Sequence, residues 1–361
     1  MHKKKPEIVH FIFNLGRGGA ETLIVRVTER MEDYEHTIVT LFDVNHFKDE
    51  LRNIRYISLK LKLYHLLFFP FIAVRFRKLM RTLKPDIVHA HLLWPVVIAR
   101  MAVPKNIPLI TTMHGYISQL IDYRKWYFRW LDRWSFRLRP STVLAVSRGA
   151  LEEYLQFLRL PPQHQEVLYT FVDTDAFKPQ PAPASPTPFR LVSVGALRYQ
   201  KNHAFLIEMM KHFRGKPVVL DIYGAGDLKD TLQEQIQTAG VAVHLKGQVH
   251  PIQSVLPNYH AMIMSSFYEG FSIGVLEAMA MKIPLVLSDI PSFREQCENR
   301  ALYFKLDEVA TAVQAVEEMM EHLGEAQQRA EAARQRVHEY FTADQHLKQL
   351  RAIYERVRKA G

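Results

Sequence analysis

Short apolar runs alternate with longer segments of mixed polarity along the whole chain. The runs lie at residues 8–13, 37–42, 87–91, 109–113 and 143–146, and then at 190–194, 218–223, 243–245, 261–264 and 285–287. Their length and apolar character predict buried strands, and the segments between them have room for helices of ten to fifteen residues. This alternation predicts βαβ units, and hence an α/β fold with parallel sheets.

A proline-rich segment divides the pattern into two halves. Residues 178–188 contain five prolines in eleven positions, which excludes a helix or a central strand and predicts a stiff linker. A chain of 361 residues is also too long for one ordinary core. We therefore expect an N-terminal domain at 1–177 and a C-terminal domain at 189–341. Residues 307–340 predict solvated helices, and residues 342–361 predict a terminal helix.

Composition places the chain among soluble globular proteins. Apolar residues make up 48% and charged residues 23%. The single cysteine, Cys297, excludes a disulfide within the chain and fits a reducing compartment. The first apolar run is too short for a spanning helix and leads into a glycine turn rather than a small-residue cleavage site. No later run reaches 18 uninterrupted apolar residues. These features favour a cytoplasmic location.

The net charge of +10 is unevenly distributed. Residues 1–176 contain 26 Lys and Arg against 17 Asp and Glu, whereas residues 177–361 contain 21 against 20. The cationic surplus of the first half indicates an anionic partner. Nucleic acid, an acidic membrane surface and a phosphorylated acceptor are the candidates at this point.

The most informative chemistry lies in residues 267–280, where Glu269 and Glu277 are separated by seven residues. A helix is predicted to begin near Ser272, and its N-terminus would attract an anion. Eight helical steps would separate the two carboxylates by about 12 Å, too far for the pair of a glycosidase. Two contacts to opposite ends of one phosphate ester fit better, although a buried helix with two incidental surface glutamates gives the same pattern.

This stretch resembles the Glu-seven-Glu signature of retaining glycosyltransferases of family 4, which have the GT-B fold. The resemblance implies two Rossmann-like, doubly wound parallel-sheet domains facing across a cleft, with the last helix crossing back to the first domain. It also implies that Glu269 contacts the donor sugar and that Glu277 binds the ribose of the nucleotide. Sugar and phosphate would be held by the backbone of Gly270, Phe271, Ser272 and Ile273.

A glycine-rich loop follows the first predicted strand. It contains Gly16, Arg17, Gly18 and Gly19, but Glu21 stands where a dinucleotide-binding fingerprint has its third glycine. The loop resembles the Gly-Gly-Ala-Glu loop of family 4, which lies near the donor phosphates and the acceptor. An ordinary tight turn between a strand and a helix is the alternative.

Three histidines occur at or near the ends of predicted strands. His91 ends one strand, and His114 lies in a Thr-x-His-Gly motif at the end of the next. Ligand sites in parallel sheets lie at the carboxyl ends of strands. Family members carry a histidine in this motif that faces the donor sugar, which implies a catalytic role for His114. His91 is a weaker candidate for sugar or acceptor contact, and we expect His89 to pack inside.

Two cations follow the first strand of the second half. Arg198 and Lys201 lie three residues apart beside a predicted helix start, an arrangement that suits a diphosphate and offsets charge on a leaving group. They resemble the Arg/Lys pair of family 4, although two solvated surface charges would look the same. One departure is Phe171, which stands where the family often has the glycine of Asn-Gly-Val-Asp.

Two segments combine aromatic and basic residues. Residues 61–81 and 122–139 carry clustered Phe or Trp together with Arg and Lys, with Trp126 and Trp130 at helical spacing. This composition predicts helices at an anionic membrane surface. The alternative is that the aromatic side chains pack on the sheet. Nucleic acid is not expected as a partner, because no recognised binding module is present.

Together the resemblance implies a retaining, metal-independent glycosyltransferase without a cofactor. It would move a sugar from a nucleotide diphosphate sugar to a hydroxyl of a glycan or lipid-linked saccharide in cell-surface polysaccharide assembly. It would act in the cytoplasm, as a peripheral protein on the inner face of the membrane. Two alternatives remain: a GT-B relative that hydrolyses or isomerises a sugar nucleotide, and a non-catalytic scaffold that binds one.

Overall fold

The computed structural model describes residues 4–16, 18–51, 54–181, 183, 185 and 187–360, without the side chains of Leu67, Ile121, Asp122 and Ala360. The chain folds into two compact units. The first extends to Thr170 and resumes at Asp344, and the second comprises Phe171–Ala343. Each unit is described by itself.

The first unit is built on a sheet of seven parallel strands in the order β3-β2-β1-β4-β5-β6-β7. Its strands are β1 (Glu7–Ile12), β2 (Glu35–Thr40), β3 (Arg55–Ser58), β4 (Ile87–His91), β5 (Leu109–Met113), β6 (Thr142–Ala145) and β7 (Gln165–Val167). The central strands are buried throughout, as expected for a parallel sheet covered on both faces.

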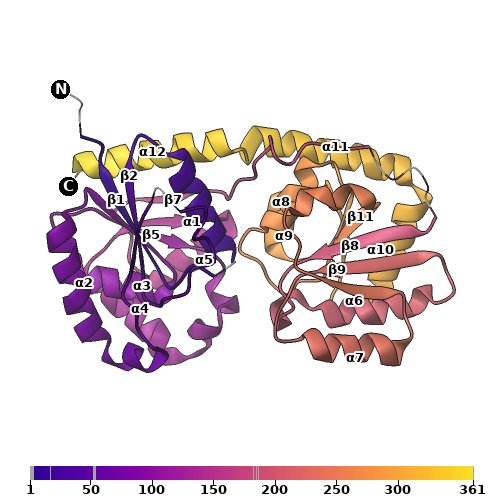
Figure 1. Cartoon of the computed structure of the whole chain (residues 1–361), viewed down its shortest axis with the longest axis horizontal. Coiled ribbons are helices and arrows are strands. Elements are labelled where there is room, and N and C mark those ends of the chain that lie inside the picture. Colours follow the sequence, from indigo (N-terminus) through magenta and orange to yellow (C-terminus); the bar gives the residue numbers. More distant parts are fainter. Residues whose placement is uncertain are drawn as a thin grey trace. The chain divides into compact units, whose positions relative to one another are not determined.

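Helices cover this sheet on both sides (Figure 1). They are α1 (Gly19–Arg30), α2 (Phe69–Leu83), α3 (Leu93–Ala102), α4 (Trp126–Leu138), α5 (Arg148–Leu158) and the terminal α12 (Ala343–Ala360), with a short 3₁₀ helix η1 (Leu63–Phe68) before α2. Helix α12 packs in the first unit through apolar residues at helical spacing, among them Leu350, Tyr354 and Val357.

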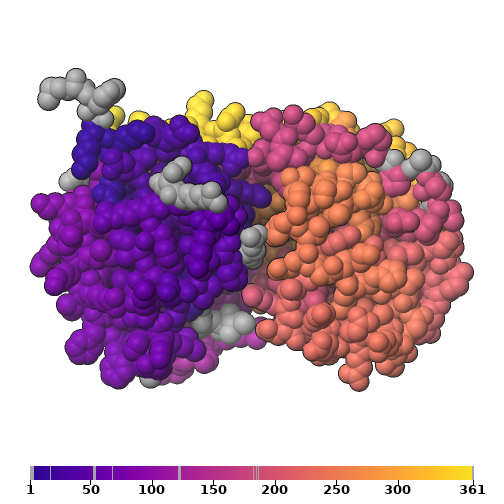
Figure 2. All heavy atoms as spheres, in the orientation of Figure 1, coloured from indigo at the N-terminus to yellow at the C-terminus, as the bar shows by residue number. Residues whose placement is uncertain are grey.

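The second unit repeats the arrangement with six parallel strands in the order β10-β9-β8-β11-β12-β13. The strands are β8 (Phe189–Val194), β9 (Val218–Tyr223), β10 (Val243–Gly247), β11 (Ala261–Met264), β12 (Leu285–Ser288) and β13 (Leu302–Phe304). The helices are α6 (His203–Met210), α7 (Lys229–Ala239), α8 (Ile273–Ala280), α9 (Pro291–Cys297), α10 (Val309–Glu321) and α11 (Leu323–Tyr340). Each unit presents a continuous surface of side chains in the space-filling view (Figure 2).

All ten strands expected from the apolar runs are confirmed, four of them with the expected bounds. The sequence pattern missed β3, β7 and β13, which are edge strands of three or four residues with exposed or half-buried positions. An edge strand buries too little to need a continuous apolar run. Residues 307–340 are helical as expected, but α10 and α11 each bury one face rather than being solvated all round.

Strand order sets where ligands can bind. In both sheets the order in which successive strands are added reverses beside the first strand. This switch point lies between β1 and β4 in the first unit and between β8 and β11 in the second. Doubly wound sheets bind ligands at the carboxyl ends of the two strands that flank this switch point. No helix in the described part of the chain is both long enough and apolar enough to cross a membrane.

Candidate functional site

The loops after β8 and β11 form the site of the second unit. Arg198 and Lys201 follow β8, and Glu269 follows β11, so all three lie at the carboxyl edge beside the switch point. Two backbone contacts join the loops: the Phe267 N–H donates to the Gln200 carbonyl at 2.9 Å, and Gln200 Nε2 donates to the Tyr268 carbonyl at 2.9 Å. The two strands therefore hold these side chains in one place.

Lys201 and Glu269 form a largely buried ion pair. Nζ of Lys201 lies 2.6 Å from Oε1 of Glu269, and their side chains are 16% and 9% exposed. The same carboxylate oxygen accepts the Ser266 hydroxyl at 2.7 Å, and Gln200 Nε2 is 3.5 Å from the other oxygen. The carboxylate is thus positioned by a cation and a hydroxyl, which a flexible surface glutamate would not be.

Arg198 is placed differently from its neighbour. Its side chain is exposed and makes no ion pair with any described residue, whereas the aliphatic stem of Lys201 lies directly over Gly195. A Cβ at position 195 would come within 2.9 Å of that stem. Gly195 therefore provides the space that brings the ammonium to Glu269, and Arg198 leaves a guanidinium available to solvent.

Helix α8 begins directly after this loop. Ser272 is its N-cap residue with an extended backbone, as expected, but its hydroxyl does not cap the helix. Instead the Gln296 side chain clamps the Ser272 backbone, with Oε1 accepting from its N–H at 3.1 Å and Nε2 donating to its carbonyl at 2.9 Å. The first N–H groups of α8, from Ile273 onward, consequently have no side-chain cap from Ser272. Gly270 and Phe271 complete the turn, and Phe271 is buried.

Glu277 lies in the second turn of α8 and is buried, with 7% of its surface exposed. Burial of a glutamate is unusual, because Glu side chains are mostly exposed in folded proteins. Glu269 is equally buried at 7%, so neither glutamate is a surface residue.

A second tight contact shapes the same edge. Gly224, after β9, has φ +154°, and a Cβ there would overlap the Gly195 carbonyl oxygen. Gly226 lies equally close to the Leu197 backbone, and the Leu197 N–H donates to the Ala225 carbonyl at 3.0 Å. The loops after β8 and β9 can approach only because both positions lack a side chain.

The glycine loop of the first unit lies at the corresponding edge, between β1 and α1. The Gly16 N–H donates to Asn14 Oδ1 at 2.9 Å, Gly18 is the N-cap of α1, and Gly19 is its first residue. The Glu21 carboxylate lies over Gly18, where a side chain would clash. Arg17 is outside the described residues.

His91 and His114 meet at the carboxyl ends of β4 and β5. Nδ1 of His91 lies 3.1 Å from Nε2 of His114, within hydrogen-bond distance. Burial lowers the pKa of His114 to about 4 and holds the pKa of His91 well below its usual value, with neighbouring histidines contributing at His91. Both imidazoles are therefore neutral near pH 7.

His89 is buried as expected, and His91 is buried beside it. Residues two apart on a strand share one face, and the two ring centroids lie 4.2 Å apart, with both residues below 5% exposed. Nδ1 of His89 lies 2.9 Å from the Tyr354 hydroxyl on α12, and Nε2 lies 2.6 Å from the Thr112 hydroxyl. Contacts to α12 and β5 thus fix His89 in the core.

Sequence reasoning did not anticipate that His91 belongs to a row of imidazoles. His10 pairs with His89 across adjacent strands, and its Nε2 lies 3.1 Å from Nδ1 of His36. Ligand atoms of His10, His89 and His91 lie within 4.8 Å of one another, a grouping that offers nitrogen ligands to a metal ion. Both nitrogens of His89 are already hydrogen-bonded, so a metal there would have to displace Tyr354 or Thr112.

The sequence also did not single out Gln200, Ser266 or Gln296 as residues of the second unit's site. Gln200 and Ser266 are each within three residues of a predicted site residue, which is the only signal that could have found them. Gln296 reaches the site from α9, 24 positions further along the chain than Ser272. No local spacing predicts such a contact.

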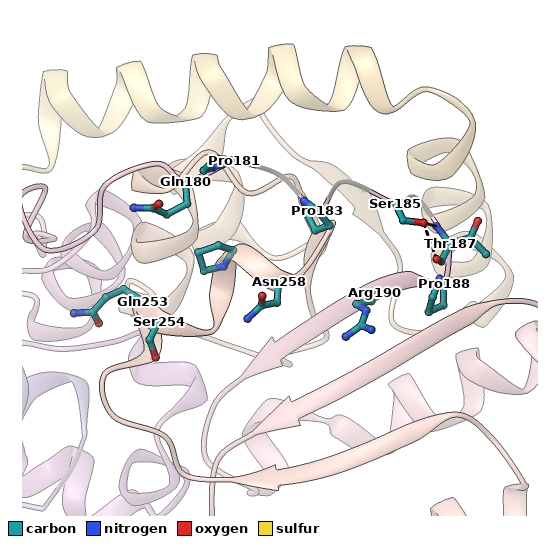
Figure 3. A pocket seen from close by; sticks show the side chains of 11 residues that line it. Gln180, Pro181, Pro183, Ser185, Thr187, Pro188, Arg190, Gln253, Ser254 and Asn258 are labelled. Atoms are coloured by element: carbon teal, nitrogen blue, oxygen red, sulfur yellow. Dashed lines mark hydrogen bonds between the residues drawn. The ribbon is translucent and has the colours of Figure 1, made fainter.

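A hollow of about 690 Å³ in the second unit lies elsewhere. Figure 3 shows Gln180, Pro181 and Pro183 of the proline-rich segment facing Gln253, Ser254 and Asn258, with Arg190 nearby. None of the described residues that line it is a predicted site residue. The proline-rich segment is tied to this unit at Ser185, whose carbonyl lies 2.9 Å from His260 Nε2.

Two successive doubly wound units, each with polar residues at its switch point, are the architecture of GT-B glycosyltransferases. Family comparison agrees: residues 17–176 match the model for Glycosyltransferase Family 4, and residues 175–336 match the model for Glycosyl transferases group 1. The chain belongs to this GT-B glycosyltransferase family.

Individual relatives are distant. An N-acetylgalactosamine-N,N'-diacetylbacillosaminyl-diphospho-undecaprenol 4-alpha-N-acetylgalactosaminyltransferase of Campylobacter jejuni is 25% identical over 86% of this chain and 89% of its own length. The O-antigen chain mannosyltransferase RfbU of Salmonella typhimurium is 28% identical over 51% of this chain and 52% of its own. Among solved structures, Anabaena HepE in complex with UDP has a TM-score of 0.81 at 16% identity, covering 97% of this chain and 99% of HepE, which supports the fold alone.

Proposed function

We propose that this protein transfers a sugar from a nucleotide diphosphate sugar to a hydroxyl acceptor, with retention of configuration and without a metal ion. The observation that carries the proposal is the buried Lys201–Glu269 pair at the switch point of the second unit, directly before the N-terminus of α8. A cation, a fixed carboxylate and a helix N-terminus in one place match the parts of a sugar diphosphate.

The donor would lie along the second unit. Arg198 and Lys201 would bind the diphosphate, and Glu269 would accept hydrogen bonds from the sugar hydroxyls. The backbone from Gly270 to Ile273 would hold sugar and phosphate, and Glu277, one turn or more further on, would bind the ribose. The neutralised diphosphate then needs no divalent cation, so no metal cofactor is part of the proposal.

The first unit would supply His114 and the glycine loop. The neutral imidazole of His114 is suited to hydrogen-bond a sugar hydroxyl, because burial keeps its pKa near 4. His91, hydrogen-bonded to His114, would fix the orientation of that ring. Gly16, Gly18 and Gly19 would let backbone approach the donor phosphates closely.

The acceptor hydroxyl would attack the anomeric carbon of the sugar from the same face that the nucleotide diphosphate leaves. The bond between the anomeric carbon and the β-phosphate oxygen breaks, the bond to the acceptor oxygen forms on the same face, and the acceptor proton passes to the leaving phosphate. Glu269 is a poor nucleophile for a covalent alternative, because Lys201 and Ser266 already bind its carboxylate. The cations would stabilise charge that develops on the leaving diphosphate.

The acceptor class is proposed from the relatives. The Campylobacter relative is named for a diphospho-undecaprenol acceptor, and RfbU for the O-antigen chain. We therefore infer a lipid-linked saccharide or glycan as the acceptor and polysaccharide assembly as the setting. The corresponding location is the cytoplasm, at the inner face of the membrane.

A thermal-shift panel of UDP-, GDP- and ADP-sugars tests donor binding. A ligand that binds only the folded state raises its apparent stability by mass action. We expect one base to shift the melting temperature of the wild type and of Glu234→Ala, a variant of an exposed glutamate on α7, but not that of Glu277→Ala. Binding of the donor that survives in Glu277→Ala would contradict the ribose assignment.

Nucleotide release then separates the reaction from its alternatives. Release that depends on an added lipid-linked saccharide supports transfer, whereas release at the same rate without acceptor indicates hydrolysis. Donor binding without any turnover indicates a scaffold. Trapping of a covalent glycosyl-enzyme would overturn the same-face mechanism.

A further inference from the structure

Exposed apolar side chains gather in two segments of the first unit. Nine of the thirteen large hydrophobic residues exposed in the described part of the chain lie between 63 and 74 or between 126 and 138. They are Leu63, Tyr64, Phe68, Phe71, Val74, Trp126, Tyr127, Trp130 and Leu138. Phe71 and Trp126 are 75% and 76% exposed, so these two side chains are not partly exposed core residues. Exposed apolar side chains concentrated in two segments indicate an interaction surface.

The exposed residues of helix α2 change in character along its length. Phe71 and Val74 are exposed near its start, and Lys78 and Arg81 are exposed on the following turns. The opposite side is buried through Ile72, Ala73, Phe76 and Met80. The exposed stripe therefore changes from apolar to cationic, moving away from the carboxyl edge of the sheet where α2 begins.

Helix α4 is anchored firmly enough to present a fixed surface. Arg100 Nη1 on α3 lies 2.5 Å from Asp132 Oδ1, with neither side chain exposed, and Tyr123 and Tyr154 also donate to this carboxylate. The opposite side of α4 carries Trp126 and Trp130 to solvent. A folded scaffold thus holds these tryptophans outward.

An aromatic bridge brings the two segments to one side of the unit. Trp94 of α3 lies between Phe69 of α2 and Phe128 of α4, with ring centroids 6.1 and 5.5 Å away. Helices α2, α3 and α4 pack side by side in that order (Figure 1). Each begins after a strand, so their N-terminal ends share the carboxyl edge that also carries His91 and His114.

Charge distinguishes this surface from an ordinary protein interface. Residues 60–81 contain no carboxylate, and residues 122–139 contain two: Asp122, whose side chain lies outside the described part of the structure, and Asp132, which is buried against Arg100. The exposed cations are Lys60, Lys62, Arg75, Arg77, Lys78, Arg81, Arg124, Lys125, Arg129 and Arg137. Aromatic side chains with many cations, and with no exposed carboxylate among the described side chains of the two segments, complement an anionic lipid surface, where rings enter the interface and cations meet the headgroups.

We propose that the nine exposed apolar residues and these cations form a docking face that binds an anionic lipid bilayer. The proposal deepens the proposed function and rests on it in one respect, since a bilayer would bring a lipid-linked acceptor to the edge that carries His91 and His114. Docking itself needs neither donor nor acceptor. It can therefore be tested apart from the reaction.

The test measures binding of the full chain to vesicles of phosphatidylcholine alone or mixed with phosphatidylglycerol, by co-sedimentation and by tryptophan emission. We expect binding to the mixed vesicles with a blue shift, since Trp126 and Trp130 would leave water. Trp126→Ala/Trp130→Ala should weaken binding by about tenfold or more, because two interfacial anchors are lost. Arg129→Gln/Arg137→Gln should weaken it as well, and about 1 M salt should abolish most of it.

Matched controls separate docking from folding and from catalysis. Leu160→Ala removes an exposed apolar side chain of the first unit outside the docking face and should bind as the wild type does. The donor-induced thermal shift should be unchanged in Trp126→Ala/Trp130→Ala, so its loss would point to misfolding rather than to docking. Equal binding of the wild type and both double variants would overturn the proposal. Self-association through this face without lipid, abolished by the tryptophan variant, would instead assign it to a second copy of the chain.

Discussion

Nζ of Lys201 and Oε1 of Glu269 lie 2.6 Å apart although the two residues are 68 positions apart in the chain. The contact joins the loops after the two strands that flank the switch point of the second unit. Because both side chains are largely buried, neither charge is compensated by water if the other is removed. The pair is therefore the most sensitive point of the proposed donor site.

Replacing one partner should harm both stability and transfer. Lys201→Met leaves the Glu269 carboxylate with only Ser266 and Gln200 as donors, which should cost about 1–3 kcal/mol in unfolding free energy. Transfer should fall by roughly 10²-fold, because charge on the leaving diphosphate loses a fixed cation. Urea unfolding followed by circular dichroism and steady-state kcat/KM measure the two effects.

The double variant Lys201→Met/Glu269→Gln separates them. It removes the unpaired charge, so stability should recover in part while transfer does not. Wild-type kcat/KM in Lys201→Met alone would refute the assigned role.

The buried pair of Arg100 and Asp132 predicts a larger effect in the first unit. Asp132→Ala leaves the Arg100 guanidinium uncompensated at zero exposure and removes the acceptor of two tyrosine hydroxyls, which should cost about 3–5 kcal/mol. All four tryptophans lie between 94 and 134, so their fluorescence reports on this unit alone. The control is Asp33→Ala, whose pair with Arg351 is partly exposed at both ends and should contribute no more than about 1 kcal/mol. Equal urea midpoints for the two variants would contradict the prediction.

The imidazole row predicts that mild acid destabilises the first unit. Burial lowers the pKa of His36 to about 4 and that of His89 to about 3, against an ordinary value of 6.5. In the unfolded chain these histidines therefore become protonated near pH 6.5, whereas in the folded unit they become protonated only at lower pH. Its unfolding free energy should be level above that pH and should decline as pH falls from 6.5 toward 4, by up to about 1.4 kcal/mol per pH unit for each such histidine.

Tryptophan fluorescence in urea at pH 5.0, 6.0 and 7.5 would measure this slope. His89→Gln, which can still hydrogen-bond to Tyr354 and Thr112, should reduce it because one protonation is lost. A urea midpoint that does not change between pH 7.5 and pH 5.0 would rule out the explanation.

Two glycines of the second unit should respond very differently to substitution. Gly224→Ala would drive a Cβ into the Gly195 carbonyl at φ +154°, which should cost about 2–4 kcal/mol and abolish the donor-induced thermal shift. Gly240→Ala, at φ +60° with open space around it, should cost only about 1 kcal/mol and retain the shift. Retention of the donor shift in Gly224→Ala would show that the close approach of the two loops is unimportant.

The amino-acid sequence by itself determined the fold class and the segments that could form a site. Buried parallel strands such as Ile87–His91 are continuous apolar runs. Gly16, His91, His114 and Glu269 lie at or soon after the carboxyl ends of such strands, so pattern alone placed these residues at the carboxyl edges of the sheets. The spacing of Glu269 and Glu277 also limited what the two carboxylates could do together. The strand positions were predicted correctly because periodicity and strand ends are local properties of the chain.

Only the tertiary structure decided which of these side chains meet. Lys201 reaches Glu269 because β8 and β11 are neighbours in the sheet, and His89 is fixed by Tyr354, which is 265 positions away on α12. The sequence pattern did not predict the edge strands β3, β7 and β13 for a related reason. Their stability comes from a paired neighbour rather than from their own apolar content. Strand order and helix docking bring together residues far apart in the chain, and no spacing within a single segment records such pairings.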